Sequence, residues 1–215
     1  MSSDTDTPKE TEASTDDARK LIILPIHGSG NDNDQRRISL FGELDEERSE
    51  HLIDQLTTLA RNAEEMVPKE PENPDSEESE RIIHPINFMI STYGGNADDM
   101  FAIYDVISSI QGQGVPVKTY GLGKVMSAGT LLLASGTKGK RKIGRHCRVM
   151  IHAVAAGSAG ELHNMENEMK SIKHIQELYI NALSRETNMT KSIIQKLLDR
   201  KVNVYLTAEE AVEYG

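Results

Sequence analysis

Residues 86–121 read INFMISTYGGNADDMFAIYDVISSIQGQGVPVKTYG, and this stretch contains the pattern that decides the fold. Residues 86–92 are short and rich in side chains that favour a strand. In residues 97–111 apolar side chains recur every three or four positions, which predicts a helix that Asn96 can cap. Residues 115–121 favour a second strand. This order predicts a right-handed crossover between two parallel strands.

The alternation of helix and strand patterns continues on both sides of this unit, so the predicted class is α/β. Upstream, residues 45–66 predict a helix capped by Asp45. Downstream come an apolar run at 128–135 and a β-type run at 147–152. Residues 160–186 predict one long helix, whose apolar stripe among many polar residues suits a projecting helix that packs against a partner subunit. The closing elements are a helix at 193–198, a strand at 202–206 and a helix opened by a Thr207–Glu210 capping box.

The composition suits one globular domain, with 37% hydrophobic and 27% charged residues in a chain of 215. We expect that domain at residues 21–215, after a disordered acidic tail at residues 1–20. Residues 67–81 combine three prolines with many glutamates, which predicts an exposed acidic loop.

Several classes of protein are disfavoured by charge and cysteine usage. A net charge of −10 argues against nucleic-acid binding. No apolar run approaches the roughly 20 residues of a membrane span, and the N-terminus lacks the pattern of a secretory signal. The single cysteine, Cys147, excludes an internal disulfide, and with only His146 beside it no zinc site is indicated. We therefore expect a cytoplasmic protein.

Three short segments carry residues suited to catalysis, and each also has an ordinary structural explanation. Gly94 and Gly95 would let backbone N–H groups face a bound group, although such a pair is also common in plain turns. Ser127 lies where a strand gives way to a helix, whose free N–H groups can receive an oxyanion, although serine is also a common helix cap. His152 ends a β-type run and could transfer protons, although a lone histidine is more often structural.

Taken together, these segments resemble the ClpP family of serine peptidases over roughly residues 38–215. The spacing of four motifs agrees with the family pattern. The matching segments are the Gly94-Gly95 pair, MSAG at 126–129, RVMIH at 148–152 and EEAVEYG at 209–215.

The resemblance implies a ClpP/crotonase-like spiral of βαβ units and a serine endopeptidase that needs no metal or other cofactor. It implies that Ser127 attacks the peptide carbonyl and that His152 accepts its proton. Gly94, Gly95 and Ala128 would form the oxyanion and substrate-binding site. Stacked heptameric rings, interlocked by the helix at 160–186 into a tetradecamer, would receive unfolded polypeptides from an AAA+ Clp unfoldase.

The sequence departs from the family at the third catalytic position. The family has an Asp two residues before an aromatic residue, whereas this chain has Asn203 before Tyr205. Asn holds an imidazole only weakly, and in a serine protease triad the change from Asp to Asn lowers turnover by ~10⁴. Asp199, one helical turn upstream, is an alternative third residue. A catalytically weak or inactive ring subunit, alone or in mixed rings, is therefore the alternative hypothesis.

Other differences from the family concern the ends of the chain and the insert. The extra amphipathic helix of the family is replaced by residues 27–35, and the acidic insert is longer than the usual turn. The family normally continues beyond Gly215 with another strand. A crotonase-like acyl-CoA enzyme shares the architecture and a backbone oxyanion hole, but has no need of the Ser127 and His152 pair.

Overall fold

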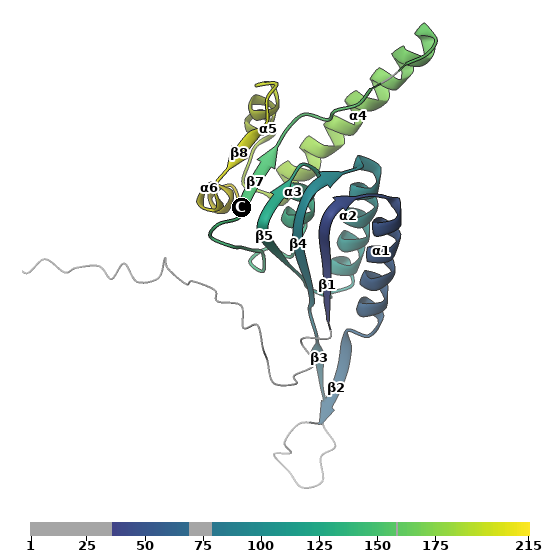
Figure 1. Cartoon of the computed structure of the whole chain (residues 1–215). Coiled ribbons are helices and arrows are strands. Elements are labelled where there is room, and N and C mark those ends of the chain that lie inside the picture. Colours follow the sequence, from purple (N-terminus) through teal and green to yellow (C-terminus); the bar gives the residue numbers. More distant parts are fainter. Residues whose placement is uncertain (1–35, 69–78, 158) are drawn as a thin grey trace, which may run out of the picture.

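The computed structural model describes residues 36–68, 79–157 and 159–215. Their centre is a six-stranded sheet of order β1-β4-β5-β7-β8, with β6 paired to β5 (Figure 1). All pairs are parallel except that of β7 with β8. The strands are β1 (Arg37–Leu44), β4 (Ile86–Gly95), β5 (Val117–Met126), β6 (Lys142–Ile143), β7 (Arg148–Ile151) and β8 (Val204–Leu206). The predicted α/β class with parallel crossovers is thus confirmed.

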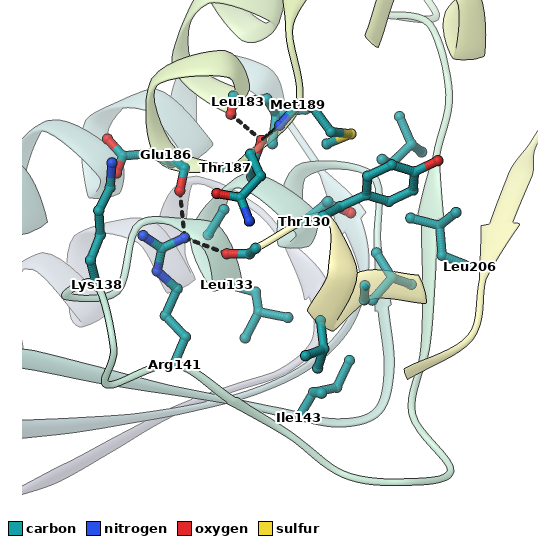
Figure 2. Close-up of a pocket in the computed structure, with 18 of the residues that line it drawn as sticks. Thr130, Leu133, Lys138, Arg141, Ile143, Leu183, Glu186, Thr187, Met189 and Leu206 are labelled. Carbon is teal, nitrogen blue, oxygen red and sulfur yellow. Dashed lines mark hydrogen bonds between the residues drawn. The ribbon is translucent and has the colours of Figure 1, made fainter. Parts of the chain in front are cut away.

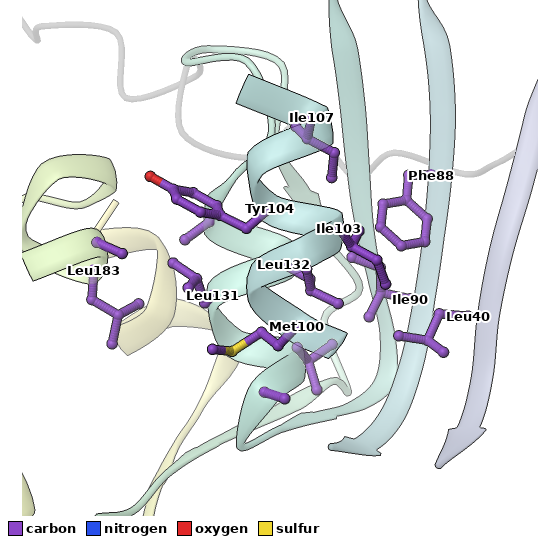
Figure 3. Close-up of a cluster of buried hydrophobic side chains, with 14 of the residues drawn as sticks. Leu40, Phe88, Ile90, Met100, Ile103, Tyr104, Ile107, Leu131, Leu132 and Leu183 are labelled. Carbon is purple, nitrogen blue, oxygen red and sulfur yellow. The ribbon is translucent and has the colours of Figure 1, made fainter. Parts of the chain in front are cut away.

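Three helices pack on one face of this sheet and bury its apolar side chains (Figure 1). They are α1 (Glu46–Arg61), α2 (Ala97–Gly112) and α3 (Ala128–Ala134). Alternate strand residues point into this layer, so Phe88 and Ile90 of β4 are fully buried near Ile103 and Leu132 (Figure 3). Asn96 caps α2 as predicted, because its side chain accepts a hydrogen bond from the Asp98 N–H at 2.7 Å.

The segment after α1 is a β-hairpin rather than the helix end and loop predicted from sequence. Helix α1 ends at Arg61, and the buried Arg36 side chain donates hydrogen bonds to the carbonyl groups of Leu59 and Asn62 at its last turn. Strand β2 (Glu64–Pro68) then pairs antiparallel with β3 (Ser79–Ile83).

This hairpin corrects the two predictions that overlap it. The helix predicted for residues 45–66 is shorter, and the loop predicted for 67–81 is strand at both ends. A contact from Arg36, distant in sequence, accounts for the early helix end, which periodicity could not reveal. The middle of the insert, residues 69–78, and the predicted tail at residues 1–20 lie outside the described residues.

Helix α4 (Leu162–Glu186) projects from the body, as the sequence predicted (Figure 1). Its buried residues, Tyr179, Ile180, Ala182 and Leu183, all lie near its C-terminal end. Helices α5 (Lys191–Leu198) and α6 (Ala208–Glu213) complete the described fold. None of the helices in the described ranges has the length and apolar character needed to cross a membrane.

Strands β4, β5 and β7 end at a common edge of the sheet. The register pairs Thr92 with Val125 and Met126 with Met150. Parallel strands present their carboxyl ends at the same edge, so the residues that follow β5 and β7 meet there. Those residues are Ser127 and His152.

Candidate active site

Ser127 occupies the junction at which β5 ends and α3 begins. Its backbone has φ 55° and ψ −122°, a left-handed conformation that non-glycine residues rarely adopt. The Ser127 N–H donates to the carbonyl of Met150 at 2.8 Å, and the Ser127 carbonyl accepts from the Thr130 N–H at 2.9 Å. The side chain makes no capping hydrogen bond to α3, so the helix-cap explanation of this serine is contradicted. Its hydroxyl is instead directed towards His152.

His152 follows directly after β7 and hydrogen-bonds to this hydroxyl. The distance from His152 Nε2 to Ser127 Oγ is 2.7 Å. Burial lowers the pKa of His152 below its ordinary value, because desolvation disfavours the charged imidazolium. A neutral imidazole at neutral pH can accept the serine proton, so the pair has the geometry and the protonation state of a nucleophile and its general base.

The structure does not bring a third residue to the other nitrogen of this imidazole. Asn203 is exposed and lies just before β8, whose Val204 pairs with Ile151 of β7. Asp199, which ends α5, accepts a hydrogen bond from Gln195 at 2.9 Å. Among the described residues, the hydrogen bond with Ser127 is the only one that the His152 ring makes. Neither Asn203 nor Asp199 therefore orients His152 here.

The two glycines at the end of β4 leave space beside the serine that any side chain would fill. A Cβ on Gly94 would lie 2.6 Å from Ser127 Cβ, and one on Gly95 would lie 1.9 Å from the Leu44 carbonyl oxygen. Both residues also have positive φ, which favours glycine. Sequence reasoning identified this pair, and the structure adds the steric reason for it.

Backbone N–H groups near Ser127 offer an oxyanion site. The Gly94 N–H is already bonded to the Thr92 hydroxyl at 2.9 Å, which leaves Gly95 and Ala128 as the candidate donors. Ala128 is the first residue of α3, and among the described residues its N–H has no partner. Two such donors at a nucleophile are the arrangement that stabilises a tetrahedral intermediate.

Sequence reasoning missed two buried threonines that hold this arrangement. The Thr92 hydroxyl bridges the Gly42 carbonyl and the Gly94 N–H, and the Thr130 hydroxyl donates to the Met150 carbonyl at 3.1 Å. Threonine is common in strands and short helices, so no local pattern could have distinguished them.

The described residues form no metal centre, and a cavity of the fold lies apart from the Ser127 and His152 pair. No three His, Cys, Asp or Glu side chains gather in the described ranges as a metal ion would require. Cys147 is buried, and desolvation raises the pKa of its thiol to about 11. A cavity of about 530 Å³ lies between α3, α4 and α6, where Arg141 donates to the carbonyl groups of Glu186 and Gly215 (Figure 2). Neither Ser127 nor His152 lines that cavity.

Several known proteins are similar in sequence to this chain. A family model described as Clp protease matches residues 76–215, which include every segment of the site. The chain is 30% identical over 197 residues to the ATP-dependent Clp protease proteolytic subunit 1 of Prochlorococcus marinus (strain MIT 9312), covering 91% of this chain and 93% of that protein. It is 37% identical over 131 residues to subunit 2 of the Corynebacterium jeikeium (strain K411) protease, covering 60% of each chain.

Substitution of Gly94 tests whether this glycine keeps the nucleophile accessible. In Gly94→Ala the new methyl group would displace Ser127, so the rate of covalent labelling by a fluorophosphonate should fall by ~100-fold, as expected for a displacement of about 1 Å. Gly112→Ala is the matched control, because a Cβ there meets nothing within 4 Å. Equal labelling rates in the two variants, measured by intact-protein mass spectrometry, would contradict the role of Gly94.

Proposed function

This chain belongs to the Clp protease family, and on that premise we propose that it is a serine endopeptidase whose nucleophile is Ser127 and whose general base is His152. The observation that carries the proposal is the 2.7 Å hydrogen bond between Ser127 Oγ and His152 Nε2. The family assignment leaves the acyl-CoA alternative without support.

The proposed reaction is acyl transfer in two steps. His152 accepts the hydroxyl proton while Ser127 attacks the peptide carbonyl, and the N–H groups of Gly95 and Ala128 bind the oxyanion. The imidazolium then gives its proton to the leaving amine, and water, activated by the same imidazole, releases the acyl group. Each oxyanion donor of this type contributes roughly 3–4 kcal/mol to transition-state stabilisation.

The proposed substrates are unfolded polypeptides delivered by an ATP-dependent Clp unfoldase. Members of this family generally form oligomeric rings with Clp ATPases, and the relatives of this chain are named as proteolytic subunits of an ATP-dependent protease. The proposed site lies at an open sheet edge rather than in the cavity beneath α3, which suits an extended chain. Gly94 and Gly95 would lie beside the bound peptide.

We further propose heptameric rings that stack into a tetradecamer through α4. Leu162, Met165 and Met169 lie along the projecting part of this helix and are exposed. A helix with such side chains in water is better stabilised against a partner, which supports an interface between copies.

A catalytically weak ring subunit is the second candidate, and one observation favours it. Among the described residues nothing hydrogen-bonds to the second nitrogen of His152, and the family Asp is replaced by Asn203. Without that carboxylate the imidazolium is poorly stabilised when it forms. Mixed rings with a more active Clp protease subunit would accommodate such a chain.

Labelling by a fluorophosphonate tests the catalytic pair directly. We expect an adduct on Ser127 that is lost in Ser127→Ala and in His152→Ala, located by peptide mass spectrometry. The labelling rate should stay high at neutral pH and decline only below about pH 6.5, because burial lowers the pKa of His152 and only protonated imidazole fails as a base. Unchanged labelling in His152→Ala would refute the assignment.

Restoring a carboxylate at position 203 tests whether this position can supply the third catalytic residue. Asn203→Asp should raise peptide hydrolysis by about tenfold, or ~1.4 kcal/mol of transition-state stabilisation. The added charge should also raise the pKa of His152 and move the acid limb of the pH profile to higher pH.

Asp199→Asn is the control, and a large loss of activity there would identify Asp199 as the third residue instead. Ring formation must be verified in each variant. If wild type and Asn203→Asp both form rings and hydrolyse nothing, the alternative of a catalytically weak or inactive ring subunit is favoured.

Native mass spectrometry tests the assembly. We expect a heptamer or a tetradecamer, because α4 exposes apolar residues that a monomer would leave in water. A stable monomer at micromolar protomer concentration would be incompatible with this proposal.

A further inference from the structure

One turn of α4 contacts the backbone of Ser127 and the backbone of Val154, two residues after His152. Gln176 and Tyr179 are three positions apart, so they lie on the same face of this helix. Gln176 reaches the segment that follows His152, and Tyr179 reaches the carbonyl of Ser127. Nothing in the motifs of the sequence marks either residue, and neither side chain takes part in the proposed proton transfer.

The contact of Tyr179 lies in the buried interior of the fold. Tyr179 is buried, and burial raises the pKa of its hydroxyl, which therefore stays protonated and able to donate. Its hydroxyl donates to the Ser127 carbonyl at 3.4 Å. On the other side of Ser127, the Thr130 hydroxyl donates to the Met150 carbonyl, the group that also accepts the Ser127 N–H. Tyr179 thus restrains the strained backbone of Ser127 through its carbonyl group.

The contact of Gln176 restrains the segment that carries the histidine. Beyond Ile151 the chain leaves the sheet, so His152 and the residues after it have no ladder of backbone hydrogen bonds. The Val154 N–H, two residues past His152, donates to the Gln176 side-chain oxygen at 3.3 Å. In the described part of residues 153–161, no other backbone N–H has a hydrogen-bond partner. Gln176 therefore accepts the one hydrogen bond that a backbone N–H donates in the described part of this segment.

We propose that Gln176 and Tyr179 are positioning residues of the active site, through which α4 fixes the imidazole and the nucleophile relative to each other. The proposal rests on the proposed serine peptidase function. Removal of one such hydrogen bond between a side chain and a backbone group leaves the site formed. The site then also adopts orientations in which His152 Nε2 is farther from Ser127 Oγ. Such a change lowers the rate of the chemical step more than it weakens substrate binding.

Gln176→Met tests this role, because methionine has a similar length and no oxygen acceptor. We expect kcat for a peptide substrate to fall by roughly three- to tenfold with KM unchanged, as the loss of one neutral hydrogen bond predicts. Hydrogen exchange measured by mass spectrometry should show faster exchange at the Val154 amide. Gln176→Glu keeps an oxygen acceptor and should restore the protection of that amide. Gln113→Met, an exposed glutamine at the end of α2, is the matched control and should change neither quantity.

Tyr179→Phe tests the second contact, since it removes only the hydroxyl. The rate of fluorophosphonate labelling at Ser127 should fall by roughly three- to tenfold while the Val154 amide keeps its protection. Unchanged kcat in Gln176→Met, or a loss of kcat without faster exchange at Val154, would overturn the proposal for Gln176. Unchanged labelling in Tyr179→Phe would overturn it for Tyr179.

These measurements distinguish failure of the proposed peptidase function from failure of the positioning role proposed for Gln176 and Tyr179. If wild type shows no labelling at Ser127, the peptidase function fails, whereas the exchange of the Val154 amide still decides whether Gln176 restrains this segment. Native mass spectra of all variants should match wild type, so that a change in assembly is not mistaken for a change in positioning.

Discussion

The arrangement of the site depends on the left-handed backbone of Ser127, which lets β5 pass into α3 without an intervening loop. A non-glycine residue in such a conformation costs of order 1–3 kcal/mol, so the surrounding structure has to hold it. The hydrogen bond from Ser127 to the Met150 carbonyl provides much of this restraint, and Met150 belongs to the strand that ends at His152. The same strand β7 therefore holds the nucleophile in its strained conformation and places its base.

The strained backbone of Ser127 also determines which side chains fit around this junction and which backbone groups the buried hydroxyls bond to. Because the sheet is parallel, β4 ends next to Ser127, and only glycine at position 94 leaves the hydroxyl accessible. The packing of α3 on β4 is equally tight, since a Cβ on Gly129 would lie 2.4 Å from a methyl group of Thr92. In this close packing, buried hydroxyl groups need partners, and those of Thr92 and Thr130 find them in backbone groups of the site.

The environment of His152 favours the neutral imidazole that accepts a proton over the imidazolium that forms afterwards. Burial keeps the imidazole neutral and ready to accept a proton. The same burial disfavours the imidazolium that forms in the transition state, and among the described residues no carboxylate is hydrogen-bonded to it. A base of this kind relies on the oxyanion donors and on accurate positioning more than a complete triad would.

The sequence alone determined the α/β class, the parallel crossovers and most helix positions, because the periodicity and capping residues that specify them are local. It also identified Ser127, His152 and the glycine pair as candidates, since their motifs lie at the ends of predicted strands. Only the tertiary structure decided that the Ser127 side chain does not cap α3, because its hydroxyl bonds to a residue 25 positions away. The end of α1 at Arg61 and the β2–β3 hairpin were likewise decided by Arg36 and by strand pairing. The contacts of Thr130, Gln176 and Tyr179 with the site also join residues distant in sequence, and no local pattern encodes which distant backbone group a buried polar side chain will meet.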